Sequence, residues 1–495
     1  MTSLRDTRGV SAPGARDMTS QNHTVEKIGG TSMSRLNELR DTLFIAKDGS
    51  RPVYGRIFVV SAFGGITNLL LEHKKTGTPG VYALFADTED DHGWHVALDN
   101  VANAMRDVHG EILSDPADRK DADDFVRERI EGARSCLLDL QRLCSYGHFR
   151  LNKQLLVIRE LLSGLGEAHS AFVATLLLRR ADVNARFVDL SGWRDEGEMS
   201  LDDRIADGLS DVDLETELPI VTGYAQCSEG LMKEFDRGYS EVTFSRIAAQ
   251  TGAREAIIHK EFHLSSADPR LVGDDRVKKV GHTNYDVADQ LSNMGMEAIH
   301  PKAAKSLRQS DIPLRVTNAF EPADPGTLID ETEAPKAAVQ IVTGLEAHTL
   351  EVFEPDMVGV KGYDATILEA LTRHNIWIVS KNSNANTITH YVNAPLKALR
   401  RVESDLVEKF PNADVSISGI GIASVIGRDL SGLKILSRGL AALEAAEIDV
   451  MAVSQGTRRV DVQFMVARDK LDDAIKILHD IAFPAPEEIA PKKAA

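Results

Sequence analysis

The stretch Val25-Glu-Lys-Ile-Gly-Gly-Thr-Ser32 combines the end of an apolar strand, two glycines and two hydroxyl side chains that can cap a helix. Glycines at such a turn let backbone N–H groups approach an anion closely, and the N-terminus of the next helix favours negative charge. An exposed helix dipole contributes only about 0.3–1 kcal/mol, so Lys27 is needed to supply a full positive charge. The structural alternative is a bare tight turn with a surface lysine.

A second glycine turn has the same organisation. The apolar run 56–60 leads into Ser61-Ala-Phe-Gly-Gly-Ile-Thr67, where a further helix can begin. Two such turns at the carboxyl ends of parallel strands converge on the place where open α/β sheets bind ligands. The sequence has no complete P-loop motif, no complete Gly-x-Gly-x-x-Gly motif, and no His-Arg-Asp or Asp-Phe-Gly triplet. The turns therefore disfavour the P-loop, Rossmann and protein-kinase classes.

Short apolar runs alternate with amphipathic stretches through residues 23–330, which we expect to form one catalytic domain. The runs that look like buried strands are 56–60, 185–190, 218–222, 256–259 and 313–317. This alternation predicts an α/β fold with a mostly parallel sheet that helices cover on both faces. Residues 86–135 interrupt it with polar and acidic sequence, which we interpret as a helical insertion with a solvated charged face.

The pattern changes at about residue 340, after a plausible linker at 331–338. Strand-like and helix-like segments then occur in one order over 340–410 and again over 413–485. Such internal repetition predicts two tandem βαββαβ units. The ends, 1–22 and 486–495, lack apolar periodicity, and we expect them to be disordered tails.

Composition excludes several functional classes. A chain of 495 residues predicts two to four domains, and its net charge of −18 argues against nucleic-acid partners. The chain has three cysteines and no Cys-x-x-Cys pair: they are Cys136, Cys144 and Cys227. We therefore expect neither a cysteine zinc site nor a disulfide framework, and the free thiols fit the reducing cytosol. No apolar stretch approaches 18 residues, so we expect a cytoplasmic protein without a membrane partner.

Charged residues accompany three further turns. Gly166-Glu167 opens a helix predicted over 168–178, Val221-Thr-Gly-Tyr224 ends a predicted strand, and Arg237-Gly-Tyr-Ser-Glu241 precedes another helix. Arg237 could form a bidentate pair with a carboxylate or a phosphate, and Glu167 could hold an ammonium group. For each residue taken singly, an ordinary surface ion pair is the alternative.

As a set, these motifs resemble those of the aspartate kinases over nearly the whole chain, tails excepted. The segments that carry the resemblance are 27–32, 60–68, 166–167, 219–224, 237–241, Ala267-Asp-Pro-Arg270 and Ile299-His-Pro301. The resemblance implies a carbamate-kinase-like α/β/α sandwich, the amino-acid-kinase fold, followed by two ACT domains.

The chain departs from the usual family pattern at four places. Tyr239 and Glu241 replace the second Gly and the Asp of Arg-Gly-Gly-Ser-Asp, and Glu297 replaces a Lys. The segment 260–266 is one residue shorter than usual and lacks its Gly. These departures look like the divergent subgroup found in ectoine gene clusters.

The resemblance implies that ATP and L-aspartate, with Mg²⁺, give ADP and 4-phospho-L-aspartate. This is the first step towards lysine, threonine and methionine, and in the subgroup towards ectoine. A free aspartate side chain is already ionised at pH 7, so catalysis must rest on positioning and charge neutralisation, without a strong base.

Roles follow from the matched positions. The implied catalytic residues are Lys27, Glu241 and Arg237, with Glu241 orienting Lys27 or the metal shell. The implied substrate-binding residues are Ser61, Thr67, Glu167 and Arg237. The implied ATP-binding residues are Lys27, Gly29, Gly30, Thr31, Lys260, Glu261, Arg270 and Glu297.

The first repeat also offers polar groups for a small zwitterionic effector. Asp364 could hold its ammonium group, and the amides of Asn382 and Asn384 its carboxylate. A plain turn is the alternative, because Asn and Ser favour turns. The ACT domains imply a homo-oligomer. Two other functions remain open: an amino-acid sensor with a degenerate kinase domain, and another amino-acid kinase such as an acetylglutamate kinase.

Overall fold

The computed structural model describes residues 22–73, 76–87, 93–195, 197–234, 238–296, 299–332 and 336–484. The chain divides into two compact units. The first unit is Met1–Gly30 with Arg51–Ala256, and the second unit is Thr31–Ser50 with Ile257–Ala495.

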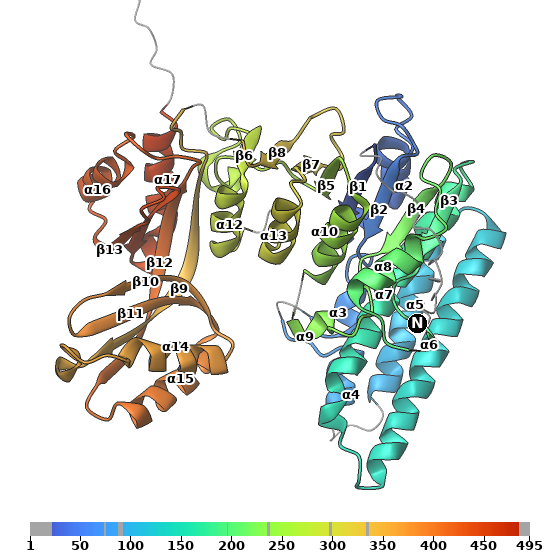
Figure 1. Ribbon diagram of the computed structural model, residues 1–495, viewed down its shortest axis with the longest axis horizontal. Helices are drawn as coiled ribbons and strands as arrows, with labels where there is room; N and C mark the ends of the chain where they lie inside the picture. Colours follow the sequence, from blue (N-terminus) through green and yellow to red (C-terminus); the bar gives the residue numbers. More distant parts are fainter. Residues whose placement is uncertain are drawn as a thin grey trace, which may run out of the picture. The chain divides into compact units, whose positions relative to one another are not determined.

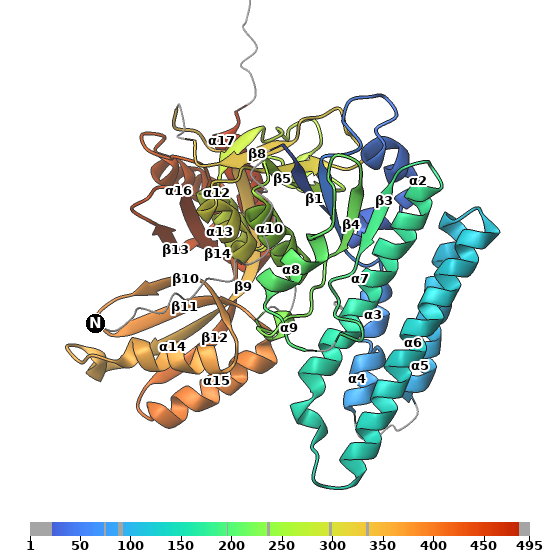
Figure 2. The same ribbon diagram turned by 45° about the vertical axis from the view of Figure 1, so that its right-hand side comes forward.

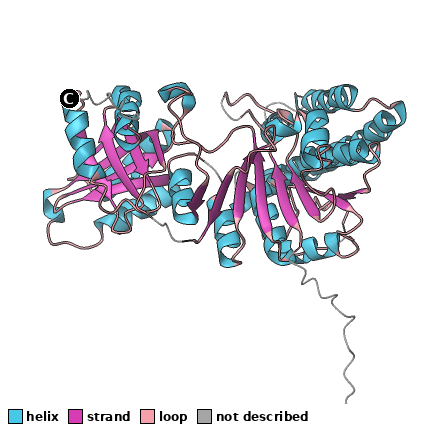
Figure 3. Cartoon of the chain, turned by 90° about the horizontal axis from the view of Figure 1, so that it is seen from above, coloured by secondary structure: helices cyan, strands magenta, loops and turns pink. Residues whose placement is uncertain are grey.

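Four parallel strands form the centre of the first unit. Their order is β3 (Ala185–Val188), β4 (Leu218–Thr222), β2 (Arg56–Val60) and β1 (Thr24–Ile28). Every residue of β1, β2 and β4 is buried, as parallel strands between two helical layers require. Figure 3 shows helices on both sides of these strands. The predicted strands at 56–60, 185–190 and 218–222 are confirmed.

Helices surround these strands (Figure 1). They are α3 (Ile66–Leu70), α4 (Val81–Ala86), α5 (Gly93–Ile112), α6 (Pro116–Ser145), α7 (Leu155–Arg179), α8 (Leu201–Leu209), α9 (Leu231–Glu234) and α10 (Tyr239–Thr251), with a 3₁₀ turn at Leu151–Lys153. Asp115 caps α6 by accepting a hydrogen bond from the backbone N–H of Ala117, and Pro116 occupies its first position. Residues 93–112 and 116–135 are thus helical, and α6 continues ten residues further.

Helix α7 runs through the middle of this helical layer, beside α5 and α6 (Figures 1 and 2). Among the described residues it is the one helix long and apolar enough to cross a membrane, and 89% of its most apolar window is buried within the fold. Its apolar surface over residues 162–178 fits a core helix, because all but one of these residues are buried.

The second unit begins with short helices and a second group of strands. The helical elements are α1 (Gly30–Met33), α2 (Leu36–Leu39), a π-helical turn (Arg40–Phe44), α11 (Pro269–Val272), α12 (Tyr285–Asn293) and α13 (Pro301–Gln309). The strands follow the order β5 (Glu255–Lys260), β7 (Leu314–Asn318), β8 (Thr327–Asp330) and β6 (His282–Asn284). The predicted strands at 256–259 and 313–317 are confirmed as β5 and β7.

An antiparallel sheet of six strands completes the second unit. Its order is β10 (Trp377–Ser383), β11 (Thr387–Asn393), β9 (Ile341–Phe353), β12 (Asp414–Ile426), β14 (Asp461–Val466) and β13 (Val450–Gln455). Strands β9 and β12 are 13 residues long each and pair over their full length.

The helices of this part are α14 (Tyr363–Arg373), α15 (Leu396–Lys409), α16 (Ile435–Ala445) and α17 (Leu471–Ala482). Helices α14 and α15 pack on one hydrophobic cluster with β9 and β11, and α16 and α17 pack on another with β12 and β14. We call residues 341–409 the first repeat and residues 414–482 the second repeat.

Within residues 336–484 each repeat has five separate elements in the order βαββα instead of six, and half of a long strand occupies its sixth position: residues 414–419 of β12 pair with β9 beside the first repeat, and residues 341–347 of β9 pair with β12 beside the second. The long strands explain the difference. The sequence pattern located only the apolar parts of β9 and β12, at 349–353 and 420–426. Half-exposed polar positions in 414–419 concealed the remainder of β12, which pairs along β9 and joins the two repeats into one sheet.

Candidate active site

Three parallel strands of the first unit end in register. Ile28 of β1 lies opposite Val60 of β2, and Val60 lies opposite Thr222 of β4. The ladder continues one residue further, because Ser61 N–H donates to Ile28 O at 3.1 Å and Gly223 N–H donates to Val60 O at 3.0 Å. All three chains therefore leave the sheet at one edge, where parallel α/β sheets bind ligands.

Two glycines at this edge are required by close packing, and one is not. A Cβ atom on Gly30 would lie 2.5 Å from the carbonyl oxygen of Ala62. A Cβ atom on Gly223 would lie 2.7 Å from Glu167 Oε2. By contrast, a Cβ atom on Gly29 would meet nothing within 4 Å. The backbone of Gly29 thus faces open space, as a phosphate-binding turn needs.

Lys27 and Glu241 form an ion pair at the same edge. Lys27 Nζ lies 3.5 Å from Glu241 Oε1, and each side chain is only 11% exposed. Lys27 comes from the end of β1, and Glu241 comes from the first turn of α10. The carboxylate neutralises a cation that burial would otherwise penalise, and it holds the ammonium group at the strand end.

Glu167 of α7 is fully buried beside this pair. Its Oε1 accepts a hydrogen bond from Ser240 Oγ at 2.8 Å, and its Oε2 has no side-chain hydrogen-bond partner in the described part of the chain. Burial raises the pKa of Glu167 to about 8, although the hydrogen bond from Ser240, the charge of Lys27 and the backbone N–H groups of Tyr224 and Ala62 partly oppose this shift. The site therefore contains a carboxyl group that a bound cation would ionise.

Ser240 was not identified from the sequence, although it precedes Glu241 on α10. Ser240 connects two predicted substrate-binding residues. It donates to Glu167, and its Oγ lies 3.4 Å from Ser61 Oγ. Thr67, also predicted, lies half-buried in α3. Ile66 and Leu70 of that helix pack beside Gly166 of α7, next to Glu167.

Tyr239, one of the departures from the family pattern, starts α10 and is buried. Its ring packs edge-on against Tyr224, which follows β4, with ring centroids 5.7 Å apart. The two rings join the start of α10 to the turn after β4. Edge-to-face pairs of this kind contribute about 0.5–1.5 kcal/mol beyond area burial.

Two predicted site residues, Arg237 and Glu297, lie outside the described residues, so their predicted roles remain untested.

Three of the predicted ATP-binding residues, Thr31, Lys260 and Glu261, lie at or near the end of β5. Ser32 Oγ donates to Glu261 Oε1 at 2.7 Å, and the carbonyl of Lys260 accepts from Ala319 N–H at 2.8 Å. Thr31 is exposed beside Ser32. From the sequence, Ser32 was expected only as a possible helix cap, and its contact with Glu261 was not predicted.

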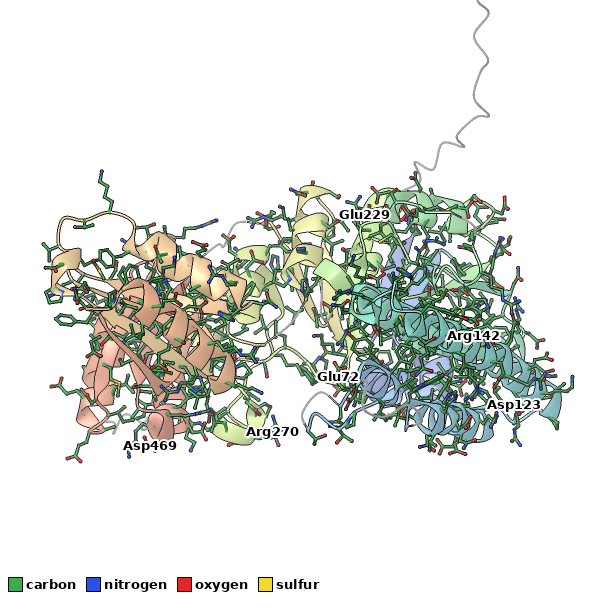
Figure 4. The ribbon with its side chains drawn as sticks, turned by 90° about the horizontal axis from the view of Figure 1, so that it is seen from below. Glu72, Asp123, Arg142, Glu229, Arg270 and Asp469 are labelled. Carbon is green, nitrogen blue, oxygen red and sulfur yellow. The ribbon has the colours of Figure 1, made fainter. Side chains whose placement is uncertain are left out.

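Arg270 has a local partner. Its guanidinium pairs with Asp268 at 2.8 Å, and Asp268 also caps α11 by accepting from the backbone N–H of Arg270. The side chain is 91% exposed and lies at the surface in Figure 4. It is accessible to an anionic ligand.

One group of three described residues in the second unit has its ligand atoms close enough to hold a metal ion: His263, Glu321 and Asp324. Lys279 Nζ lies 2.6 Å from Asp324 Oδ2 and 3.5 Å from Glu321 Oε2. The ammonium group offsets part of the negative charge of the two carboxylates, which weakens their attraction for a cation.

The predicted effector residues of the first repeat divide into two groups. Asp364 Oδ2 pairs with Lys381 Nζ at 2.6 Å, and His390, opposite Lys381 on β11, lies 3.6 Å from Asp364 Oδ1. His390 is completely buried, neither ring nitrogen makes a hydrogen bond to the described chain, and burial lowers its pKa to about 4. Lys381 and His390 were not identified from the sequence.

The two predicted amides have different positions. Asn384 Oδ1 accepts from Asn386 N–H and Thr387 N–H, so it stabilises the turn between β10 and β11. Asn382 Nδ2 donates weakly to the Tyr391 hydroxyl at 3.4 Å and lies next to Lys381.

The family model of the amino acid kinase family matches residues 22–318. Aspartate kinase Ask_Ect of Stutzerimonas stutzeri is 49% identical over 459 residues, which cover 92% of this chain and 96% of that protein. Lysine-sensitive aspartokinase 3 of Escherichia coli is 23% identical over 93% of this chain and 99% of its own length.

Solved structures support the same fold. The structure of Escherichia coli aspartokinase III in complex with lysine and aspartate matches with a TM-score of 0.69 at 20% identity, covering 94% of this chain and 100% of that one. The same enzyme in complex with aspartate and ADP matches with a TM-score of 0.68 over 93% of this chain. The fold expected from the sequence, a kinase domain followed by ACT-type domains, is confirmed.

Proposed function

The chain belongs to the amino acid kinase family and, within it, to the aspartate kinases, and from this premise we propose that the strand ends of the first unit transfer the γ-phosphoryl group of ATP to the side-chain carboxylate of L-aspartate. The products are ADP and 4-phospho-L-aspartate. The observation that carries the proposal is the buried carboxyl group of Glu167, held through one oxygen by Ser240, beside the Lys27–Glu241 pair. It offers an anionic subsite and a cationic subsite at one sheet edge.

Glu167 binds the ammonium group of the substrate in this proposal. Its Oε2 has no side-chain hydrogen-bond partner in the described chain, and Ser240 fixes the other oxygen. A buried carboxyl group with a pKa of about 8 is poorly ionised until a cation arrives, so binding of the ammonium group expels a proton. Ser61 and Thr67 contact the remainder of the amino acid, and Arg237 binds its α-carboxylate.

Lys27 neutralises charge on the transferring phosphoryl group, and the backbone N–H groups of Gly29 and Gly30 assist it. Glu241 orients Lys27 through the 3.5 Å ion pair. Mg²⁺ would accompany ATP and neutralise phosphate charge when bound, and Glu241 would offer the ion's water shell a carboxylate, because oxygen ligands suit this ion.

We also assign Thr31, Lys260, Glu261, Arg270 and Glu297 to ATP binding. We place the enzyme in the cytoplasm, at the first step towards lysine, threonine, methionine or ectoine. In the first repeat, Lys381 binds the carboxylate of a small amino-acid effector, and Asp364 with Asn382 binds its polar groups. The chain forms a homo-oligomer through its ACT-type repeats.

Hydroxylamine trapping tests the activity, because it converts an acyl phosphate to a hydroxamate, whose complex with ferric ion is coloured. The purified protein with Mg²⁺ and ATP should form hydroxamate with L-aspartate and far less with N-acetyl-L-glutamate. Hydroxamate with N-acetyl-L-glutamate alone would indicate an acetylglutamate kinase. Amino-acid binding with no ADP release would indicate a sensor.

A further inference from the structure

Three residues in the last turn of α17 and just beyond contact the segment that follows β5. His479 Nε2 lies 3.0 Å from Ser266 Oγ, Asp480 forms an ion pair with Arg276, and the Lys278 ammonium lies 5.4 Å from the centre of the Phe483 ring. Both sides belong to the second unit. The end of helix α17 therefore contacts the segment that follows the proposed ATP-binding residues Lys260 and Glu261.

Ser266 is the centre of these contacts. It is fully buried, its N–H donates to Lys278 O at 2.8 Å, and its Oγ accepts from Lys278 N–H at 2.9 Å. Its carbonyl accepts from Val342 N–H at 2.7 Å, at the start of β9. Because Ser266 Oγ already accepts the hydrogen bond from Lys278, its O–H is available to donate to Nε2 of a neutral His479 ring.

The environment of His479 favours the neutral ring. The side chain is buried, and the elements packed against it present the positive charges of Arg276 and Lys278, of which Arg276 is paired with Asp480. Burial and these charges lower its pKa. The ring also packs against Phe483, with centroids 4.8 Å apart.

The anchored residues lie next to the proposed nucleotide contacts. Leu264 packs in one core with Ile341 and Ile422 of the six-stranded sheet. Only residues 261–263 separate this anchor from the end of β5, and Glu261 among them bonds Ser32. Fixing residues 264–266 restricts the conformations of such a short connection.

We propose that the last turn of α17 positions the ATP-binding segment, and that His479 acts as the positioning residue through its hydrogen bond to Ser266. This inference rests on the proposed function, since that function assigns Lys260 and Glu261 to ATP. It makes nucleotide affinity depend on the second repeat, and it leaves the aspartate subsite of the first unit unaffected.

The test is ADP binding by calorimetry in the full-length chain, with Ser266→Ala, His479→Ala and the double variant. Each single variant should bind ADP about five- to tenfold more weakly, the factor expected for one hydrogen bond. If both residues act through the same bond, the double variant should bind no more weakly than Ser266→Ala. His479→Gln, which keeps a polar nitrogen, should recover part of the affinity. KM for ATP should rise in parallel, and KM for aspartate should stay within about twofold.

Leu478→Ala is the matched control. Leu478 is buried on the same helix but packs against Gly439 of α16. It should lower the thermal midpoint and leave ADP affinity unchanged. Additive losses in the double variant, equal losses in the control, or unchanged ADP affinity in both single variants would overturn the inference. A wild-type chain that binds ADP but makes no hydroxamate would instead overturn the proposed function.

Discussion

Glu26 and Arg56 form a buried bidentate ion pair between neighbouring parallel strands, with Nε–Oε1 at 2.7 Å and Nη2–Oε2 at 2.8 Å. Glu26 directly precedes Lys27 on β1. Because successive side chains of a strand point to opposite faces, one strand carries a structural ion pair on one face and the proposed catalytic cation on the other. Removing either partner of a buried pair leaves an uncompensated charge.

Arg56→Met should therefore destabilise the chain by about 3–5 kcal/mol. The double variant Glu26→Met/Arg56→Met should recover much of that loss, because it removes both charges. Chemical denaturation measures the free energy of unfolding. A single variant as stable as wild type would contradict the structural role of the pair.

Lys27→Ala should lower kcat by on the order of 10³-fold or more, because removal of one preorganised donor can already cost ~10²–10³. Lys47 provides a matched control: it is exposed and pairs with Asp41 at 3.0 Å. Lys47→Ala should change kcat by less than roughly twofold. Retention of more than half of wild-type kcat by Lys27→Ala would exclude the assignment.

Aspartate affinity should depend on pH through Glu167. The free carboxyl, with its pKa raised to about 8, is mostly protonated at pH 7, and the substrate ammonium requires the ionised form. Affinity should thus rise with pH until about 8 and fall by up to tenfold per unit below it. Calorimetry at pH 7 in buffers of different ionisation enthalpy should detect proton release.

Glu167→Gln should abolish this pH dependence and weaken aspartate binding about 30-fold or more, as expected when one partner of a buried charge pair is removed. Glu72→Gln is the control variant, because Glu72 pairs with Arg159 and is less buried than Glu167. A pH dependence that persists in Glu167→Gln would assign the titration to another group.

Arg237→Lys should raise KM for aspartate much more than KM for ATP, because a point charge replaces a planar fork that grips a carboxylate. Steady-state kinetics with each substrate varied in turn measure the two effects. Arg246→Lys is the control, since Arg246 pairs with Asp202 on the first unit. An effect confined to ATP would move Arg237 into the nucleotide site.

Calorimetry with lysine, threonine and ectoine should detect binding of an effector to the wild-type chain. Lys381→Ala and Asp364→Ala should each lose this binding and keep kinase activity. The two substitutions break the same 2.6 Å pair, so both should act. Arg373→Ala, on the same helix as Asp364, is the control. If no amino acid binds at millimolar concentration, the first repeat has a structural or dimerising role.

The sequence by itself determined the parallel strands of the first unit and the turns at which they end. Apolar runs such as 56–60 and 218–222 predict buried parallel strands. The glycine turns after residues 28 and 60 indicate the edge of the sheet at which the strands end. These signals are local, because strand periodicity, helix caps and glycine conformations depend on residues close in the chain.

The tertiary structure alone decided which distant groups meet. Ser240 reaches Glu167 across 73 residues, Lys381 reaches Asp364 across 17, and His479 reaches Ser266 across 213. The full length of β9 and β12 also became visible only through their pairing. Helix packing and strand register place such partners in contact, and one sequence without its fold contains no local pattern that specifies them.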